Sequence, residues 1–146
     1  MNIQIKHFNE LNTKELFDIL KFRVKVFIVE QKCCYQEIDD YDKESYHIFS
    51  YEDCDLIAYA RVLPKGLTFD EVSIGRVLSK YRKRGNGTKI MQAAMDTAIE
   101  KFDADKITIE AQTYAKKLYE NLGFKQISDE FLEDGIPHIK MEWNKI

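Results

Sequence analysis

The chain has 146 residues, 45% of them apolar, which suits one globular domain, residues 1–146, with a sizeable core. Its formal net charge of −3 argues against a general nucleic-acid binder. No apolar run is long enough to span a bilayer and the N-terminus has no apolar signal core, so we expect a cytoplasmic protein with neither a membrane nor a nucleic acid as partner. The cysteines are odd in number and lack metal-ligand spacing, which indicates free thiols, a reducing compartment and no metal site: Cys33, Cys34 and Cys54.

The first third of the chain predicts a strand, a long helix and a loop. Apolar and polar residues alternate over residues 2–8, as in a half-buried strand. Asn12 and Glu15 have the spacing of a reciprocal capping box, and apolar residues follow at helical spacing as far as Gln31. Residues 32–44 are polar and acidic, which indicates a loop that either borders a substrate or is simply solvated.

The rest of the chain predicts strands and two helices. Strand-type patterns occupy residues 46–51, 56–63, 72–78, 106–112, 124–131 and 138–143. Helical patterns occupy residues 88–102 and 114–122, and Gly123 fits the C-cap of the second helix. The order β, α, β, β, β, α, β, α, β, β favours an α/β (α+β) fold in which helices cover a mixed sheet.

A basic loop with two glycines lies between the strand 72–78 and the helix 88–102. It reads Arg82-Lys83-Arg84-Gly85-Asn86-Gly87-Thr88. The glycines let the backbone turn tightly and approach a ligand, and the helix adds unpaired N–H groups and the positive end of its dipole. The loop therefore predicts a site for a phosphate or pyrophosphate, with a basic surface turn as the alternative. A P-loop run is absent, and Ile90 replaces the third glycine of the dinucleotide fingerprint.

The remaining pattern, Arg82-x-x-Gly85-x-Gly87, resembles the acetyl-CoA loop of the GNAT superfamily of N-acetyltransferases. Tyr119 and Gly123-Phe124 match a second GNAT signature, an aromatic residue followed by Gly-Phe. Further short runs resemble the ElaA-like branch: Val26-Phe27-Ile28-Val29-Glu30-Gln31, Ala60-Arg61, Gly75-Arg76-Val77, Ala111-Gln112 and Glu133-Asp134-Gly135-Ile136-Pro137-His138. The resemblance implies the GNAT fold, in which two neighbouring parallel strands, here 72–78 and 106–112, splay apart to admit acetyl-CoA.

The resemblance also implies which residues contact acetyl-CoA as cosubstrate. The loop amides would hold the pyrophosphate, so the expected contacts are Arg82, Lys83, Arg84, Gly85, Asn86, Gly87 and Thr88. The N–H of Val77 is the expected oxyanion donor, and Gln112, where many members have Asn, is expected to contact the pantetheine arm. Tyr119 stands where the family places the acid that protonates the thiolate; a tyrosine packed in the core is the alternative.

The resemblance does not specify the general base that deprotonates the amine. The candidates are Glu30, His47, Glu110, Glu133 and His138, with a water chain as an alternative. Glu30 and His138 are also the candidates for contact with the acceptor substrate.

Arg61 and Arg76 lie on adjacent predicted strands. An arginine on a strand is usually paired with a carboxylate, and Glu30 or Glu110 would serve; binding of an acidic substrate is the alternative. The acidic loop 37–44 would attract a cationic amine, such as a polyamine or a peptide N-terminus, unless it is merely solvated.

These features predict an acetyl-CoA-dependent N-acetyltransferase that acts on a primary amine of a small molecule or peptide by direct attack on the thioester. The alternative is a non-catalytic coenzyme A-binding or sensing module that kept the loop and lost the chemistry. Tyr119 favours the enzyme, because a sensor has no need of an acid for the thiolate. A nucleic-acid binder is weakly supported, because the basic cluster is small and lies in an acidic protein.

Overall fold

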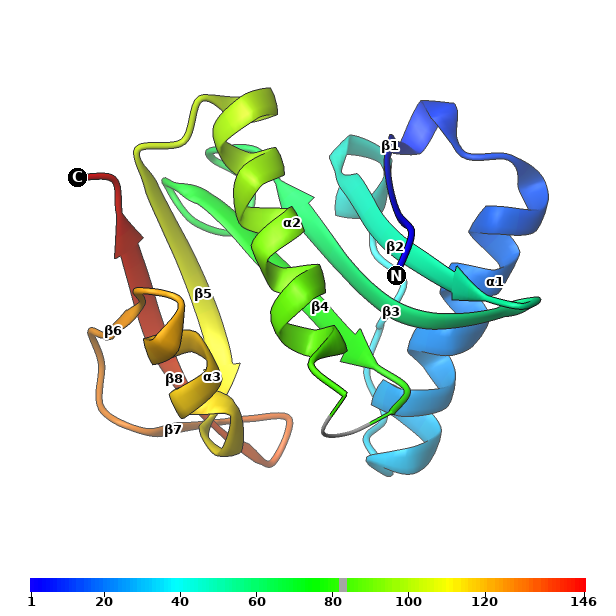
Figure 1. The fold of residues 1–146 in the computed structure, drawn as a ribbon. Helices are drawn as coiled ribbons and strands as arrows, with labels where there is room; N and C mark the ends of the chain where they lie inside the picture. The colour runs from blue at the N-terminus through cyan, green and yellow to red at the C-terminus, as the bar shows by residue number, and fades with distance from the viewer. Residues whose placement is uncertain (82–83) are drawn as a thin grey trace.

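The computed structural model describes residues 1–81 and 84–146, so the predictions at Arg82 and Lys83 lie outside the described residues (Figure 1). Within them, eight strands form one mixed sheet in the order β1-β2-β3-β4-β5-β8-β6, and β7 also pairs with β8. Their bounds are β1 Ile3–His7, β2 Tyr46–Glu52, β3 Asp55–Leu63, β4 Val72–Ser79, β5 Lys106–Gln112, β6 Lys125–Gln126, β7 Phe131–Glu133 and β8 Ile136–Asn144. The predicted mixed sheet is confirmed.

Helices cover both faces of this sheet (Figure 1). The α-helices are α1 Thr13–Val24, α2 Asn86–Phe102 and α3 Lys116–Asn121; α1 continues as a π-helix over Lys25–Glu30. Short 3₁₀ turns occupy Phe8–Glu10, Asp40–Glu44 and Thr113–Ala115. Among the described residues, no helix is long and apolar enough to cross a membrane.

The predicted capping box starts α1. The Glu15 N–H donates to Asn12 Oδ1 at 2.7 Å, and the Asn12 N–H donates to Glu15 Oε1 at 3.0 Å. Glu15 also accepts from Lys6 of β1 at 2.8 Å, so the cap ties the start of the helix to the edge of the sheet. These bonds satisfy backbone N–H groups that would otherwise be orphaned at the helix end.

The two faces of β3 pack against different helices because its side chains alternate. Ala58 and Ala60 belong to the core under α2 and α3, whereas Tyr59 packs with Ile19 of α1 on the opposite face. Every residue of β3 after Asp55 is buried. This strand, covered on both sides, pairs with β4 in the middle of the sheet.

The strands β4 and β5 form a parallel pair that opens along its length. Only two register pairs join them, Val72 with Ile107 and Ser73 with Thr108. Beyond these pairs β4 stays paired with β3, with one shift of register, and β5 keeps its register with β8. The sheet is therefore split in its second half, which confirms the predicted splay of these strands.

The chain after Gly123 differs from the predicted strand 124–131. Only Lys125–Gln126 and Phe131–Glu133 pair with β8, and the segment between them is bridged by other bonds. The Lys140 N–H donates to the Ser128 hydroxyl at 2.9 Å in place of a strand carbonyl. The turn before β8 is tighter than predicted, because Asp134 and Gly135 both have positive φ and β8 already begins at Ile136.

Candidate active site

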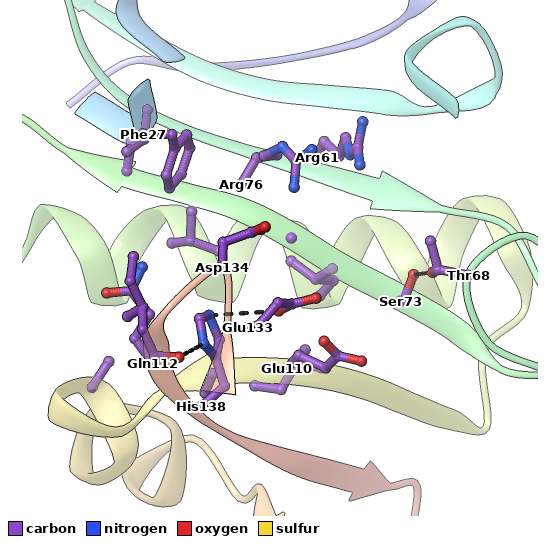
Figure 2. A pocket seen from close by; sticks show the side chains of 18 of the residues that line it. Phe27, Arg61, Thr68, Ser73, Arg76, Glu110, Gln112, Glu133, Asp134 and His138 are labelled. Carbon is purple, nitrogen blue, oxygen red and sulfur yellow. Dashed lines mark hydrogen bonds and ion pairs between the residues drawn. The ribbon is translucent and has the colours of Figure 1, made fainter. Parts of the chain in front are cut away.

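A cavity of about 560 Å³ occupies the region where β4 and β5 separate (Figure 2). Strand β4 lines it with Gly75, Arg76 and Val77, and strand β5 lines it with residues from Ile109 to Gln112. Further lining comes from the π-helix that follows α1, from α3, from the β7–β8 turn and from β8. The split in the sheet thus creates a space that segments far apart in the sequence enclose.

The structure brings six of the candidate site residues to this cavity: Val77, Glu110, Gln112, Tyr119, Glu133 and His138. Glu30 is exposed at the end of the π-helix and is not among the residues that line the cavity, although Phe27 and Gln31 of the same segment are. The π-helical turn changes which side chains of this segment face the sheet, and the sequence carries no clear signal for it.

A β-bulge lies in β4 at the cavity wall. Tyr59 pairs with Leu78 and Arg61 pairs with Gly75, so one residue of β3 lies opposite two residues of β4, Arg76 and Val77. Arg76 has φ +54, which is uncommon for a residue with a side chain. A bulge releases backbone groups from the ladder and re-aims the strand, and bulges occur often beside active sites. The backbone at Val77 is therefore suited to bind a ligand rather than to pair with β3.

The glycine loop leads from β4 into α2. Gly85 has φ +73 and caps α2, whereas Gly87 lies within the helix, where an added Cβ would meet Leu118 Cδ1 at 3.6 Å. Only Gly85 therefore needs glycine for its backbone conformation. Asn86 is buried, and its Nδ2 has no hydrogen-bond partner among the described residues. A buried, unpaired amide donor beside a helix N-terminus suits an anionic or carbonyl ligand.

The side chains of Arg84 and Thr88 in the predicted loop differ in their contacts. Arg84 donates to Glu52 at 3.0 Å and lies 4.6 Å from the Tyr81 ring centroid, while Thr88 is exposed in the first turn of α2. The charge of Arg84 is thus partly compensated at the surface. The main chain of the loop and the N-terminus of α2 are therefore the principal groups here for binding an anion.

Tyr119 of α3 reaches the cavity from the core. Its ring packs edge-on against Phe124 with the centroids 6.0 Å apart, and the residue is buried. No hydrogen bond ties its hydroxyl to the part of the chain that the structure describes. Burial raises the pKa of the Tyr119 phenol above its usual value, so the hydroxyl stays protonated. It is therefore a hydrogen-bond donor without a described partner.

Carboxylates gather on the opposite side of the cavity from the bulge. Glu110 is exposed to the cavity, and partial desolvation there together with the neighbouring Glu133 carboxylate raises the pKa of Glu110 to about 7. Glu133 Oε2 lies 3.7 Å from His138 Nε2, and His138 Nδ1 lies 2.7 Å from the Ile136 carbonyl oxygen (Figure 2). Three of the five candidates for the general base are thus neighbours.

His47, a fourth candidate, is a structural residue. It is fully buried, with Nδ1 2.6 Å from the Tyr59 hydroxyl and Nε2 3.0 Å from the Asp42 carbonyl oxygen. Burial lowers the pKa of His47 to about 4. It is not among the residues that line the cavity.

The acidic loop 37–44 is solvated only in part, because Asp40 and Glu44 are exposed whereas Glu37 and Asp42 are buried. Tyr41 of this loop lines the cavity, so a loop that borders a substrate stays a prediction. Arg23 of α1, itself fully buried, donates to Glu37 at 3.0 Å and to Asp42 at 2.7 Å. Although burial raises the pKa of Asp42, the guanidinium groups of Arg23 and Arg61 hold it below its usual value. These carboxylates are part of the interior.

Arg61 and Arg76 complete this ion network, and neither pairs with Glu30 or Glu110. Arg61 donates to Asp39 at 2.6 Å and to Asp42 at 2.9 Å. Arg76 Nε lies 2.6 Å from Glu37 Oε2. The sequence did contain a signal, because Arg23 follows the apolar residues of α1 at helical spacing and a buried arginine needs carboxylates.

A sheet split between parallel strands, with a bulge at the opening and a helix N-terminus beyond it, defines the class of acyl-CoA N-acyltransferases, and two solved structures agree. One is described as an acyl-CoA N-acyltransferase from Pseudomonas aeruginosa, with a TM-score of 0.90, 36% identity, and 98% of this chain and 99% of that chain covered. The other is ElaA of Escherichia coli, with a TM-score of 0.91, 32% identity and coverage of 98% and 99%.

Sequence comparisons narrow this class. The family model of an acetyltransferase (GNAT) domain matches residues 12–145. A UPF0039 protein of Schizosaccharomyces pombe is 44% identical over 140 residues, 93% of this chain and 92% of that protein. The E. coli protein ElaA is 34% identical over 139 residues, 92% of this chain and 91% of that protein. The chain therefore belongs to the GNAT acetyltransferase family, and within it to the ElaA-like proteins.

Proposed function

We propose that the chain is an acetyl-CoA-dependent N-acetyltransferase that transfers an acetyl group to a primary amine of a small molecule or peptide by direct attack on the thioester. The observation that carries this proposal is the opening of the sheet between β4 and β5 after two register pairs, with a cavity lined from both strands. Such a site lets two substrates meet, one from each side of the sheet. Family membership supports acyl transfer in general, and the acetyl group is the finer part of the proposal.

Acetyl-CoA would bind with its pyrophosphate at the start of α2. The main chain from Gly85 to Thr88 and the buried amide of Asn86 would supply the donors, because this part of the helix has orphan N–H groups. Arg84, together with Arg82 and Lys83 outside the described residues, would add positive charge. The pantetheine arm would then run into the opening, where the Gln112 amide lines the cavity.

The chemistry requires donors at the carbonyl oxygen and a proton for the sulfur. As a neutral amine attacks, the carbonyl oxygen becomes anionic, and the Val77 N–H at the bulge would stabilise it. The carbon–sulfur bond then breaks, and the Tyr119 hydroxyl would donate to the leaving thiolate. Because burial disfavours the Tyr119 phenolate, this donation is expected only as negative charge develops on sulfur.

A screen of amine acceptors with acetyl-CoA tests the proposal. The assay follows the released thiol and identifies the acetylated product by mass spectrometry. We expect thiol release and product in equal amounts with at least one class of primary amine. Binding of acetyl-CoA without product from any amine in the screen would contradict the proposal and support the non-catalytic sensing module.

A further inference from the structure

We propose that Glu110 is the catalytic residue that accepts the proton of the attacking amine, that Glu133 and His138 position it, and that the site therefore takes amines that arrive as ammonium cations. This inference rests on the proposed function, because it assigns roles in the same cavity. It concerns the wall of the cavity opposite the arginines, where Figure 2 shows Glu110, Glu133 and His138 together.

The strand register places these groups together. Side chains alternate along β5, so Glu110 and Gln112 lie on one face while Ile109 and Ala111 lie on the other, in the core under α2. On β8 the residue opposite Gln112 is His138. The tight β7–β8 turn then brings Glu133 back over β8. Glu110 thus lies beside the cavity position where Gln112 would meet the pantetheine arm.

Among the described residues, the charged groups beside Glu110 come from β7 and β8. Glu133 comes from β7, and Lys140 lies directly opposite Glu110 on β8, with His138 two residues before it. The Lys140 ammonium lies 5.0 Å from the Phe69 ring centroid and lowers the pKa of Glu110 less than Glu133 and partial desolvation raise it. No arginine pairs with Glu110 in the described part of the chain, whereas arginines pair with Glu37, Asp39 and Asp42 of the acidic loop. Its carboxylate therefore remains available for chemistry.

The hydrogen bond between His138 and the Ile136 carbonyl shows which ring nitrogen carries a hydrogen. The Ile136 carbonyl oxygen can only accept, so His138 Nδ1 carries the hydrogen of that 2.7 Å bond. In a neutral ring, Nε2 then has a lone pair that faces the Glu133 carboxylate at 3.7 Å. Glu133 in turn neighbours Glu110, and its negative charge raises the pKa of the Glu110 carboxyl. Glu110 is therefore a proton acceptor that lies near two further acceptors, the Glu133 carboxylate and His138 Nε2.

The transfer balances without any further reagent. An alkylammonium acceptor, R–NH₃⁺, gives one proton to the Glu110 carboxylate and becomes R–NH₂. Its nitrogen forms a bond to the thioester carbon, and the carbon–sulfur bond breaks as the electron pair leaves on sulfur. The second amine proton reaches the sulfur, directly or through Tyr119. The products are R–NH–acetyl, coenzyme A as the free thiol, and a protonated Glu110 that returns its proton to solvent.

A carboxyl titration tests the pair without needing any acceptor. The side-chain ¹³C signal of Glu110 is followed against pH in the wild type, in Glu133→Gln and in the matched control Glu130→Gln, an exposed residue before β7. We expect titration of Glu110 near pH 7 in the wild type and the control. In Glu133→Gln the midpoint should move down toward the ordinary range. An ordinary midpoint in the folded wild type would overturn the proposal.

Two amine probes test the catalytic role. Benzylamine is an ammonium ion at neutral pH, whereas hydroxylamine is largely neutral and needs no proton acceptor before it attacks. Glu110→Gln should lower kcat/KM about 100-fold or more for benzylamine and much less for hydroxylamine. Its calorimetric affinity for acetyl-CoA should equal that of the wild type. Equal losses with both probes, or full activity with benzylamine, would contradict the proposal.

Failure of the proposed function gives a different result. If the wild type binds acetyl-CoA and acetylates neither probe nor any other amine, the acetyltransferase proposal fails, and Glu110 has no catalytic role with it. If the wild type acetylates hydroxylamine but no ammonium amine, the acetyltransferase proposal stands and the selectivity for cations is overturned. The two inferences are thus decided separately.

Discussion

Two sets of carboxylates lie near the cavity, and they differ in burial and in the presence of arginine. In the loop 37–44, Glu37, Asp39 and Asp42 are paired with three guanidinium groups. On the opposite wall, Glu110 and Glu133 face each other (Figure 2). Pairing with a cation favours ionisation, whereas a neighbouring like charge and partial desolvation favour a bound proton. The first set therefore holds the structure together, and the second is poised to exchange protons.

Replacement of Arg23 should disturb the arginine-paired carboxylates of the loop 37–44 most severely. Arg23→Met should reduce the free energy of unfolding by about 3–5 kcal/mol, because it leaves Glu37 and Asp42 buried with incomplete compensation. Chemical denaturation measures the change. The matched control is Arg84→Met at the exposed pair with Glu52, where the loss should be within about 1 kcal/mol. Equal, small losses would show that the network does not support the fold.

The same region should make the protein sensitive to acid through His47. Its pKa is about 4 in the folded state and 6.5 in the reference state, so its contribution to stability is complete above pH 6.5 and is lost as the pH falls toward 4. The loss should approach about 3 kcal/mol across this window. Denaturation at a series of pH values should show this loss in the wild type and a flatter curve in His47→Gln. Identical slopes would exclude His47 as the cause.

On the catalytic side, Tyr119→Phe should lower kcat and kcat/KM together by about 100-fold, because the hydroxyl matters when charge builds on sulfur. The ring and its contact with Phe124 remain, so the melting temperature should change little. Steady-state kinetics and a melting curve check both points. Full activity would exclude Tyr119 as the donor, and a variant that melts early would indicate a tyrosine needed mainly for packing.

The glycine loop is expected to show the smallest effect. Gly87→Val should weaken acetyl-CoA binding by about tenfold, because a branched side chain crowds both Leu118 and the approach to the helix N-terminus. Gly87→Ala is the matched control, since its Cβ makes only an ordinary 3.6 Å contact. Calorimetry compares the affinities. A folded Gly87→Val variant with wild-type affinity would exclude this loop as the binding site.

Local patterns predicted most of the fold. Alternation identified β1 and β5, strand-type runs between turn residues identified β2, β3, β4 and β8, and the Asn12–Glu15 box identified the start of α1. The segment 124–131 was predicted wrongly as one strand, because its pairing depends on Ser128 and β8 rather than on its own alternation. The π-helix was also not predicted, and it has no periodic signature in a short stretch.

The site was predictable only where a motif marked it. The cavity is lined by Val77, Gln112, Tyr119 and His138. The composition of the acidic loop, in contrast, did not predict which of its carboxylates would be buried. The pairs that bury Glu37 and Asp42 join residues 14 and 19 positions apart on different elements. The assembled sheet decides which carboxylates pair with an arginine. This pairing distinguishes the structural carboxylates Glu37 and Asp42 from the reactive carboxylate of Glu110.

A crystal structure of the chain with acetyl-CoA would show whether the opening between β4 and β5 is the acyl-CoA site. The account predicts the thioester in the cavity beside Val77, the pyrophosphate at the start of α2, and Glu110 on the far side of the thioester. Acetyl-CoA bound elsewhere, or in the opening with its pyrophosphate away from α2, would contradict it.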